Sequence, residues 1–314
     1  MQERKGIKPN WEFFMVNGII NVYKEKGFTS FDVVAKMRGI FHQKKIGHTG
    51  TLDPDAVGVL PVCLGKATKV CDLLTEKDKE YKAVLLLGQE TDTQDISGEI
   101  LNQSSVEVIK EQIEEAILSF VGSYEQVPPM YSALKVNGQK LCDLARKGIT
   151  VERKARPVTI YRIEIVDIRI PEVELIVHCS KGTYIRTLCD DIGKKLGCFG
   201  CMKSLVRTRV AQFSLERAYK LEELQVLSQK PQEEWEFLSP IDMVFEQYPS
   251  ITASEEAQKR IQNGNRIPQE LILDFGEDKQ GQTLRLYDFN QKFIGLYTYL
   301  KEDKEYKPIK LFME

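Results

Sequence analysis

Apolar residues follow two spacings along the chain, one typical of β-strands and the other typical of α-helices. Runs rich in β-branched residues predict strands at 18–23, 81–87, 157–168 and 173–180. Apolar residues three or four positions apart predict helices that begin near residues 30, 104 and 183, and a shorter helix around 70–74. The strands and helices are interspersed without a regular βαβ rhythm, so we expect an α+β fold.

Polar residues mark the expected ends of these helices. Ser30 and Thr183 stand where a helix N-cap is expected, and Ser104 with Glu107 has the spacing of a capping box. Gly197 follows the last apolar residue of the third helix, which is the usual place for a C-terminal cap.

Two segments depart from this pattern and suggest how the chain is divided. Residues 125–155 are rich in proline, glycine and basic side chains and contain the turn signal Asn137-Gly138, so we expect an excursion inserted into the main body. Residues 214–248 are acidic and have a helical pattern that Pro249 is expected to end. Short strands and turns follow, and they predict a small β-rich module at the C-terminal end.

The distribution of charge points to a polyanionic partner. The 314-residue chain has 42% apolar and 29% charged residues and a formal net charge of −2, an ordinary globular composition. Basic residues nevertheless outnumber acidic ones in residues 1–45, 135–156 and 181–209. Each cluster alone is typical of a solvated surface, but three of them in a nearly neutral protein favour RNA or DNA as the partner.

Several classes of protein are disfavoured by what the chain lacks. No stretch is long and apolar enough to span a membrane, and the N-terminal residues lack the apolar core of a signal peptide. Seven cysteines without regular spacing favour reduced thiols and a cytoplasmic location. Three histidines and the lone pair Cys198 and Cys201 do not suggest a metal site, and no phosphate-binding glycine motif suggests a nucleotide cofactor. Asp92 and Asp95 are interpreted as part of a structural turn rather than a cation loop.

The segment GHTGTLDP, residues 47–54, contains the first candidate for chemistry. Asp53 precedes Pro54, and Asp followed by Pro is a common entry to a helix, so Asp53 could be an N-cap. Alternatively, it is a catalytic carboxylate on a rigid, glycine-hinged loop. Local sequence alone favours the cap.

Two further segments combine aromatic and basic residues at the ends of predicted strands. SKGTYIRT, residues 180–187, places Tyr184 and Arg186 in the first turn of a helix, where a cation is unfavourable unless an anion lies beside it. We therefore expect a carboxylate or phosphate partner for Arg186, with a plain surface arginine as the alternative. Tyr81, in the segment KEYK, is either a core residue or a platform on which a base stacks.

Taken together, these segments resemble the bacterial tRNA pseudouridine-55 synthases, the B type of the pseudouridine synthase superfamily. The resemblance runs from Asn17 onward and rests on six motifs in the same order. They are GHTGTLDP (47–54), KEY (79–81), MYSALK (130–135), SKGTYIRT (180–187), LVRTR (205–209) and NGNR (263–266).

The resemblance implies isomerisation of one uridine in the T arm of tRNA to pseudouridine, without a cofactor or a metal. It makes Asp53 the essential carboxylate, pairs Arg186 with it, and places Tyr184 in the pocket. The remaining carry-overs are Tyr81 as the stacking residue, Leu205 as a pocket residue, and His48 as the residue that fills the space of the flipped nucleotide. Whether the carboxylate attacks C1′, attacks C6 or deprotonates the ribose stays open. Flipping the base out of a folded loop costs a few kcal/mol, which an aromatic platform and a wedge residue offset.

The resemblance also implies a division of the chain. A pseudouridine synthase catalytic domain with a mixed, largely antiparallel sheet is expected over 17–248, with an RNA-binding thumb at 125–155. A small PUA-like β-barrel is expected over 249–314, and residues 1–16 form an N-terminal extension. The chain departs from the family pattern in two places. Tyr23-Lys24-Glu25 stands where the family often has Asp-Lys-Pro, and the retained Lys24 is assigned a structural or RNA-contact role. Val206 replaces the first arginine of a common Arg-Arg pair. We expect a monomer. The rival interpretations are a non-catalytic tRNA-binding or folding protein, and a phosphate-ester hydrolase that uses Asp53 and His48.

Overall fold

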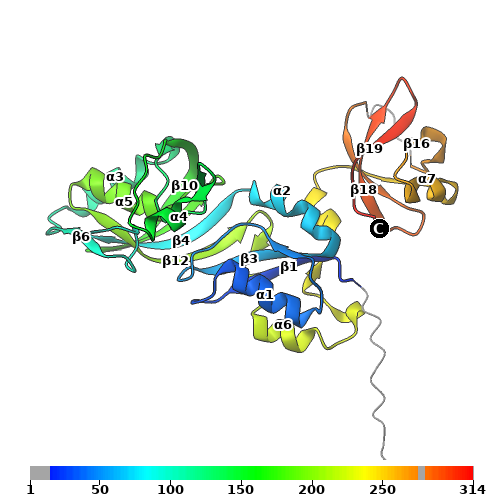
Figure 1. Ribbon diagram of the computed structural model, residues 1–314. Coiled ribbons are helices and arrows are strands. Elements are labelled where there is room, and N and C mark those ends of the chain that lie inside the picture. The colour runs from blue at the N-terminus through cyan, green and yellow to red at the C-terminus, as the bar shows by residue number, and fades with distance from the viewer. Residues whose placement is uncertain (1–14, 275–279, 314) are drawn as a thin grey trace, which may run out of the picture.

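A ten-stranded sheet runs through the larger part of the molecule in the computed structural model, which describes residues 15–274 and 280–313 (Figure 1). The main path of the sheet has the order β14-β1-β3-β12-β4-β11-β10-β7, with β2 paired to β3 and β13 paired to β12. Its strands are β1 (Gly18–Lys24), β2 (Ile46–His48), β3 (Val57–Leu64), β4 (Lys79–Leu87), β7 (Gly122–Gln126), β10 (Arg156–Arg169), β11 (Glu172–Cys179), β12 (Gly200–Val210), β13 (Phe213–Ser214) and β14 (Leu238–Ser239).

One pair of strands in this sheet is parallel, and the others are antiparallel. Val57 and Gly58 at the start of β3 lie beside Val206 and Arg207 of β12. The sheet is therefore mixed and largely antiparallel, which confirms the expected fold. Because β3 and β12 run the same way, the loop that enters β3 lies beside the part of β12 that carries the LVRTR motif.

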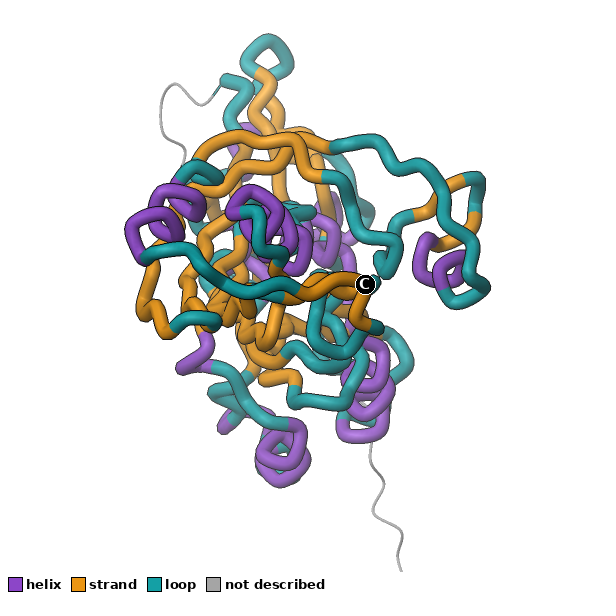
Figure 2. Tube along the Cα trace, turned by 90° about the vertical axis from the view of Figure 1, so that its left-hand side faces the viewer, coloured by secondary structure: helices purple, strands orange, loops and turns teal. Residues whose placement is uncertain are grey.

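Helices cover the sheet in two groups (Figure 1). The helices α3 (Lys110–Leu118) and α5 (Ile185–Leu196) lie at one end, and α1 (Ser30–Ile40) and α6 (Leu221–Leu227) lie nearer the other. The short helices are α2 (Cys71–Thr75), α4 (Leu141–Ala145) and α7 (Gln258–Gln262), with 3-10 turns η1 (Gly65–Val70), η2 (Leu215–Arg217), η3 (Gln232–Glu234), η4 (Ile241–Phe245), η5 (Glu255–Ala257) and η6 (Gln269–Leu271). Figure 2 shows strands through the middle of the molecule and most helices at its periphery. No helix within residues 15–274 and 280–313 is long and apolar enough to cross a membrane.

Two hairpins lie outside the main sheet. One is formed by β5 (Gln89–Thr91) and β6 (Ile100–Gln103). The other, formed by β8 (Lys135–Val136) and β9 (Gln139–Lys140), lies within the expected excursion and turns at Asn137 and Gly138, both of which have positive φ. A small apolar cluster around Met130, Leu141 and Leu144 supports this second hairpin separately from the main core.

A second sheet of five strands forms the C-terminal part, which fits the expected PUA-like module. Its order is β15 (Ser250–Thr252), β17 (Thr283–Tyr287), β18 (Phe293–Leu300), β19 (Glu305–Leu311) and β16 (Ile267–Pro268). The sheet has its own apolar core, and it contacts the rest of the chain through Phe245, Phe293 and Phe312, whose rings pack together. Of the expected N-terminal extension, residues 1–14 lie outside the described residues.

The expected helix starts were wrong by a few residues. Thr29, not Ser30, caps α1, with Asp32 completing a capping box, because Ser30 points inward and bonds to Leu52. Helix α3 begins at Lys110 after Ile109, and Ser104 instead donates to the Cys198 carbonyl. Thr183 does not cap α5, whose N-cap is Tyr184, and its hydroxyl instead donates to the Ser180 carbonyl. The C-terminal cap at Gly197 is confirmed, since its φ of 73° is left-handed. The segment 214–248, expected to be helical, holds only α6, three 3-10 turns and β14.

Candidate active site

Asp53 lies in the loop that joins β2 to β3, and no helix begins after it. The Ala56 amide donates to the Asp53 carbonyl over 3.1 Å, which closes a single turn at Pro54 and Asp55 before β3 starts at Val57. The expected turn after Asp53 is therefore present, but the N-cap interpretation is wrong, because no helix follows and the carboxylate pairs with Arg186. The Asp53 side chain is 42% exposed, so the carboxylate is accessible to a ligand.

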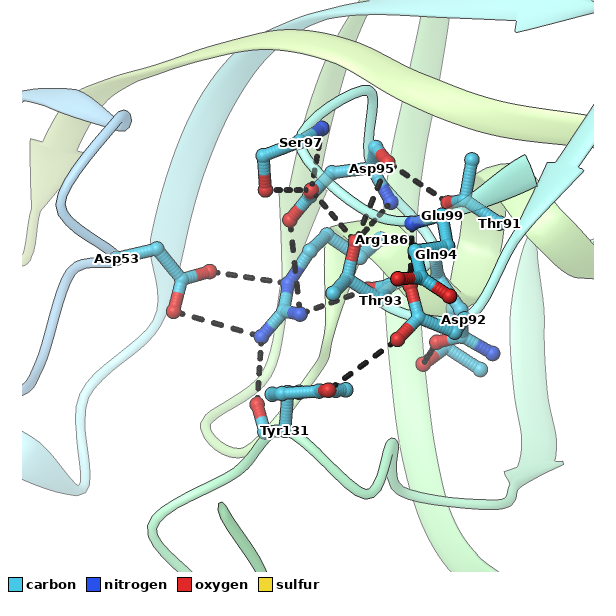
Figure 3. A network of polar contacts seen from close by, with 11 residues as sticks. Asp53, Thr91, Asp92, Thr93, Gln94, Asp95, Ser97, Glu99, Tyr131 and Arg186 are labelled. Carbon is cyan, nitrogen blue, oxygen red and sulfur yellow. Dashed lines mark hydrogen bonds and ion pairs between the residues drawn. The ribbon is translucent and has the colours of Figure 1, made fainter. Parts of the chain in front are cut away.

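The Asp53 carboxylate faces the guanidinium of Arg186, as Figure 3 shows. Arg186 Nε lies 3.0 Å from Oδ2, and a terminal nitrogen donates to Oδ1 over 3.4 Å. Arg186 itself is buried near the N-terminus of α5, where the helix dipole opposes a cation. The expected anionic partner is thus a carboxylate, and it comes from a loop 133 residues earlier in the chain.

The other side of the Arg186 guanidinium is also fully occupied. Its terminal nitrogens donate to the carbonyls of Thr93 and Tyr131, each over 2.8 Å, and one of them lies 3.6 Å from Asp95 Oδ2 (Figure 3). The polar turn predicted around Asp92 and Asp95 is confirmed. It serves to hold Arg186, a use that the sequence did not suggest for it.

The electrostatics of Asp53 reflect opposing influences. Burial by the surrounding protein raises the pKa of Asp53, and the charge of Asp95 raises it further, while Arg186 and Lys24 lower it. The net direction is upward from the ordinary value of an aspartate. A carboxylate in this setting is held by an arginine yet poorly solvated, which makes it more basic than an exposed one.

Two buried cations, Lys24 and Arg207, bind backbone carbonyls of the loop that carries Asp53. Lys24 is fully buried, and its ammonium donates to the carbonyls of Phe28 (2.6 Å), Pro54 (3.0 Å) and Glu25 (3.2 Å). Burial lowers the pKa of Lys24 to about 8. Of the two roles open to Lys24, this geometry supports the structural one, because the ammonium group faces carbonyls and not solvent.

Arg207 is the second buried cation, and the LVRTR motif that contains it suggested no role for it. Its Nε donates to the Val59 carbonyl over 2.7 Å, and its terminal nitrogens lie 3.4–3.5 Å from the carbonyls of Gly50 and Thr51. It is paired with Tyr81 across β12 and β4. No strand was predicted over the residues of β12, so nothing in the sequence indicated that Arg207 faces inward.

The predicted stacking and pocket residues lie on neighbouring strands beside this loop. Tyr81 on β4 and Leu205 on β12 are both mostly buried and share a core cluster with Leu52. Burial raises the pKa of Tyr81 to about 12, so its hydroxyl is protonated at neutral pH.

His48 ends β2 at the start of the same loop. Its Nδ1 accepts the Gly50 amide over 3.3 Å, and burial lowers the pKa of the imidazole. No hydrogen bond joins His48 to Asp53, both of which the structure describes.

Tyr184 is positioned by a residue that the sequence did not identify. The Gln126 side chain, at the end of β7, accepts from the Tyr184 amide over 2.8 Å and donates to its carbonyl over 3.0 Å. This pair of bonds replaces a side-chain cap at the N-terminus of α5 and fixes the Tyr184 backbone. Burial raises the pKa of Tyr184, so its hydroxyl keeps its proton at neutral pH.

A second layer supports the turn that holds Arg186. Gln94 has a positive φ of 65°, and its side-chain amide bridges α5 by accepting from Thr187 (2.7 Å) and donating to Asp190 (2.8 Å). Its carbonyl accepts from the Met202 amide of β12 over 3.0 Å. The turn is therefore fixed to both α5 and β12, and nothing in its local sequence indicates this.

All seven cysteines are free, in agreement with reduced thiols. Among the residues that the structure describes, no group of three or more histidine, cysteine or carboxylate side chains could hold a metal ion.

Comparison with known proteins covers nearly the whole chain. Residues 38–185 match the family model described as TruB family pseudouridylate synthase (N terminal domain), and residues 186–246 match that of the tRNA pseudouridylate synthase B C-terminal domain. A protein of Lachnoclostridium phytofermentans named tRNA pseudouridine synthase B is 50% identical over 308 residues, which cover 95% of this chain and 100% of the relative. One of Alkaliphilus oremlandii with the same name is 46% identical, covering 94% of this chain and 97% of the relative.

Solved structures agree with this assignment. One chain in the crystal structure of a Cbf5-Nop10-Gar1 complex is 26% identical in sequence to this chain and superposes on it with a TM-score of 0.70. The match covers 99% of this chain and 92% of that one. A structure of an H/ACA RNP bound to a substrate RNA containing 2'-deoxyuridine is 25% identical with a TM-score of 0.69, covering 99% and 93%.

Proposed function

The chain belongs to the TruB family of pseudouridylate synthases and isomerises uridine 55 of tRNA to pseudouridine, and we propose that Asp53 is the carboxylate on which this reaction depends. One observation carries the proposal. The Asp53 carboxylate is accessible, and two nitrogens of the buried Arg186 side chain bind it. Lys24 and Arg207 hold the backbone of the loop that carries Asp53. A carboxylate supported in this way keeps its position when a substrate base binds beside it.

The reaction replaces the bond from C1′ to N1 of uracil by a bond from C1′ to C5. The proton on C5 must leave and N1 must gain one, so the isomerisation is balanced without any other reactant. The ionised Asp53 can act as nucleophile or as base in this sequence. We propose that Tyr184, whose hydroxyl remains protonated, takes part in proton transfer to or from the uracil ring.

We propose that the base is bound between the side chains that flank the loop. Tyr81 supplies a ring for stacking, Leu205 closes the pocket on β12, and His48 fills the space that the flipped nucleotide leaves. Lys24 contributes by holding the Pro54 carbonyl next to Asp53.

We propose that the enzyme recognises the T-arm stem-loop of tRNA and works as a cytoplasmic monomer without a cofactor. The thumb at 125–155 and the module at 249–314 would supply further RNA contacts around the catalytic domain at 17–248. The basic side chains of the thumb and its separate small core support this division of roles.

The decisive test is Asp53→Asn, with Asp55→Asn as a matched control two residues away. Asp55 is 65% exposed and pairs only with Lys26 at 3.7 Å among the described residues. We expect the Asp53 variant to fold and bind tRNA but to form no detectable pseudouridine on an unmodified transcript, while the Asp55 variant works normally. Turnover near the normal rate by the Asp53 variant would remove that residue from the mechanism.

A further inference from the structure

A shallow groove of about 430 Å³ lies between α1 and β2, and His48, assigned above to the space of the flipped nucleotide, forms part of its lining. One side of it is formed by α1, through Phe31, Val34 and Arg38, and the other by the segment that leads into β2. Phe31, Val34 and Arg38 follow each other at three and four residues, so they share one face of the helix.

The groove combines an apolar floor with an exposed aromatic ring. Val34 and Ile46 are buried and form the floor. Phe31 is 64% exposed, an unusual position for a phenylalanine in a helix that buries Val33, Val34 and Met37. A large exposed ring over an apolar floor suits a flat ligand.

The charges around the groove all have the same sign. Arg38, Lys44 and Lys45 are among its lining residues, and no acidic residue is. None of the three forms an ion pair with an acidic residue in the described part of the chain. Arg38 lies 5.8 Å from the Phe31 ring and is fixed by one bond from Nε to the Lys44 carbonyl over 3.1 Å. Its terminal nitrogens have no partner within residues 15–274 and 280–313.

We propose that this groove binds one unpaired nucleotide next to the target uridine, with its base on Phe31 and its phosphate between Arg38, Lys44 and Lys45. An aromatic ring beside cations is the combination that binds single-stranded nucleic acid, since every base has a stacking face and every linkage a negative charge. The place of the groove supports this occupant, because His48 both lines it and begins the loop that carries Asp53. An RNA strand that delivers a uridine to Asp53 therefore passes beside the groove. The inference rests on the proposed function.

The test is a thermodynamic cycle between Phe31→Ala and single abasic nucleotides placed at each loop position of a T-arm hairpin. Binding is measured in an Asp53→Asn background, so that no turnover occurs. We expect Phe31→Ala to weaken binding about fivefold or more. An abasic site at one nucleotide flanking the target should weaken binding to the same extent, and the two changes together should cost little more than either alone. Phe31→Tyr, which keeps the ring, should bind normally.

The matched control is Lys36→Ala, an exposed cation on the same helix that lies over Phe28 instead. It should show no coupling with any abasic position. Arg38→Ala should lower the slope of log Kd against log salt concentration by about 0.7 relative to the parent. Additive effects of Phe31→Ala at every loop position would overturn the proposal, as would an acidic peptide that competes for the groove as strongly as the hairpin.

Pseudouridine formation by the unaltered enzyme on the same hairpin distinguishes a failure of the proposed groove from a failure of the assigned reaction. Normal product with no coupling at Phe31 would refute the groove alone. Coupling at Phe31 without product would refute the assigned reaction and leave the groove as an RNA site.

Discussion

The turn that holds Arg186 depends on Gln94. Replacing Gln94 should therefore change the catalytic rate through the position of Arg186 and not through a contact with the substrate. Gln94→Gly removes two hydrogen bonds, one from the Thr187 hydroxyl and one to the carboxylate of Asp190, which is only 2% exposed. Their loss costs about 1 kcal/mol for the neutral bond and about 2 kcal/mol for the charged one. Glycine adopts the φ of 65° freely, which returns about 1 kcal/mol. The free energy of unfolding should therefore fall by about 2 kcal/mol.

Gln94→Leu makes the comparison sharper, because leucine also loses both bonds but keeps the backbone strain. It should be less stable than the glycine variant by about 1 kcal/mol. Both variants remove the side-chain bonds that join this turn to α5, while its backbone bond to Met202 remains. The Thr93 carbonyl and Asp95 are then held less firmly against Arg186. A displacement of about 1 Å in such a group costs on the order of 100-fold in rate.

The assays are urea unfolding, equilibrium binding of tRNA, and single-turnover formation of pseudouridine. We expect binding within about twofold of the parent and a single-turnover rate lower by about 10- to 100-fold. Ser105→Ala is the control, since within the described residues the Ser105 side chain bonds only to the exposed Glu107, and the change should alter stability by less than about 0.5 kcal/mol. A Gln94 variant with the predicted loss of stability and an unchanged rate would show that the turn does not position Arg186.

Three other outcomes follow from the site. The single-turnover rate should fall as pH drops through the pKa of Asp53, because the carboxylate form reacts. Asp95→Asn removes a charge that raises this pKa, so the acid limb of the pH–rate profile should move to lower pH. A move of that limb to higher pH would contradict the assigned effect of Asp95. Tyr81→Phe keeps the ring and should bind RNA nearly normally, whereas Tyr81→Leu should lose about 1–3 kcal/mol of binding free energy, and equal affinities of the two variants would argue against stacking. Saturating tRNA should protect residues 135–150 from limited proteolysis, and an unchanged cleavage pattern would count against a role of the thumb in RNA binding.

The type of fold and most of the site residues could be predicted from local patterns in the sequence. The strands at β1, β4, β10 and β11 and the helices α1, α3 and α5 were predicted, because alternation and helical periodicity are local properties that burial on one face imposes. Asp53, Tyr81, Tyr184 and Arg186 were identified from short motifs. The family these motifs suggested is confirmed by relatives that match almost the whole chain.

The contacts between these residues could not be predicted from the sequence, because they join segments that are distant in the chain. Helix caps were misassigned because a serine or threonine can bond equally to a distant backbone group, as Ser30 does with Leu52. The grip of Arg186 on Asp53 spans 133 residues, and the supports from Gln94, Gln126 and Arg207 also join segments far apart in the chain. Such contacts depend on which strands become neighbours. In the main sheet, β3 and β12 form the one parallel pair, which brings the Asp53 loop beside Arg207. Strand order is a property of the whole packed core, and no local pattern specifies it.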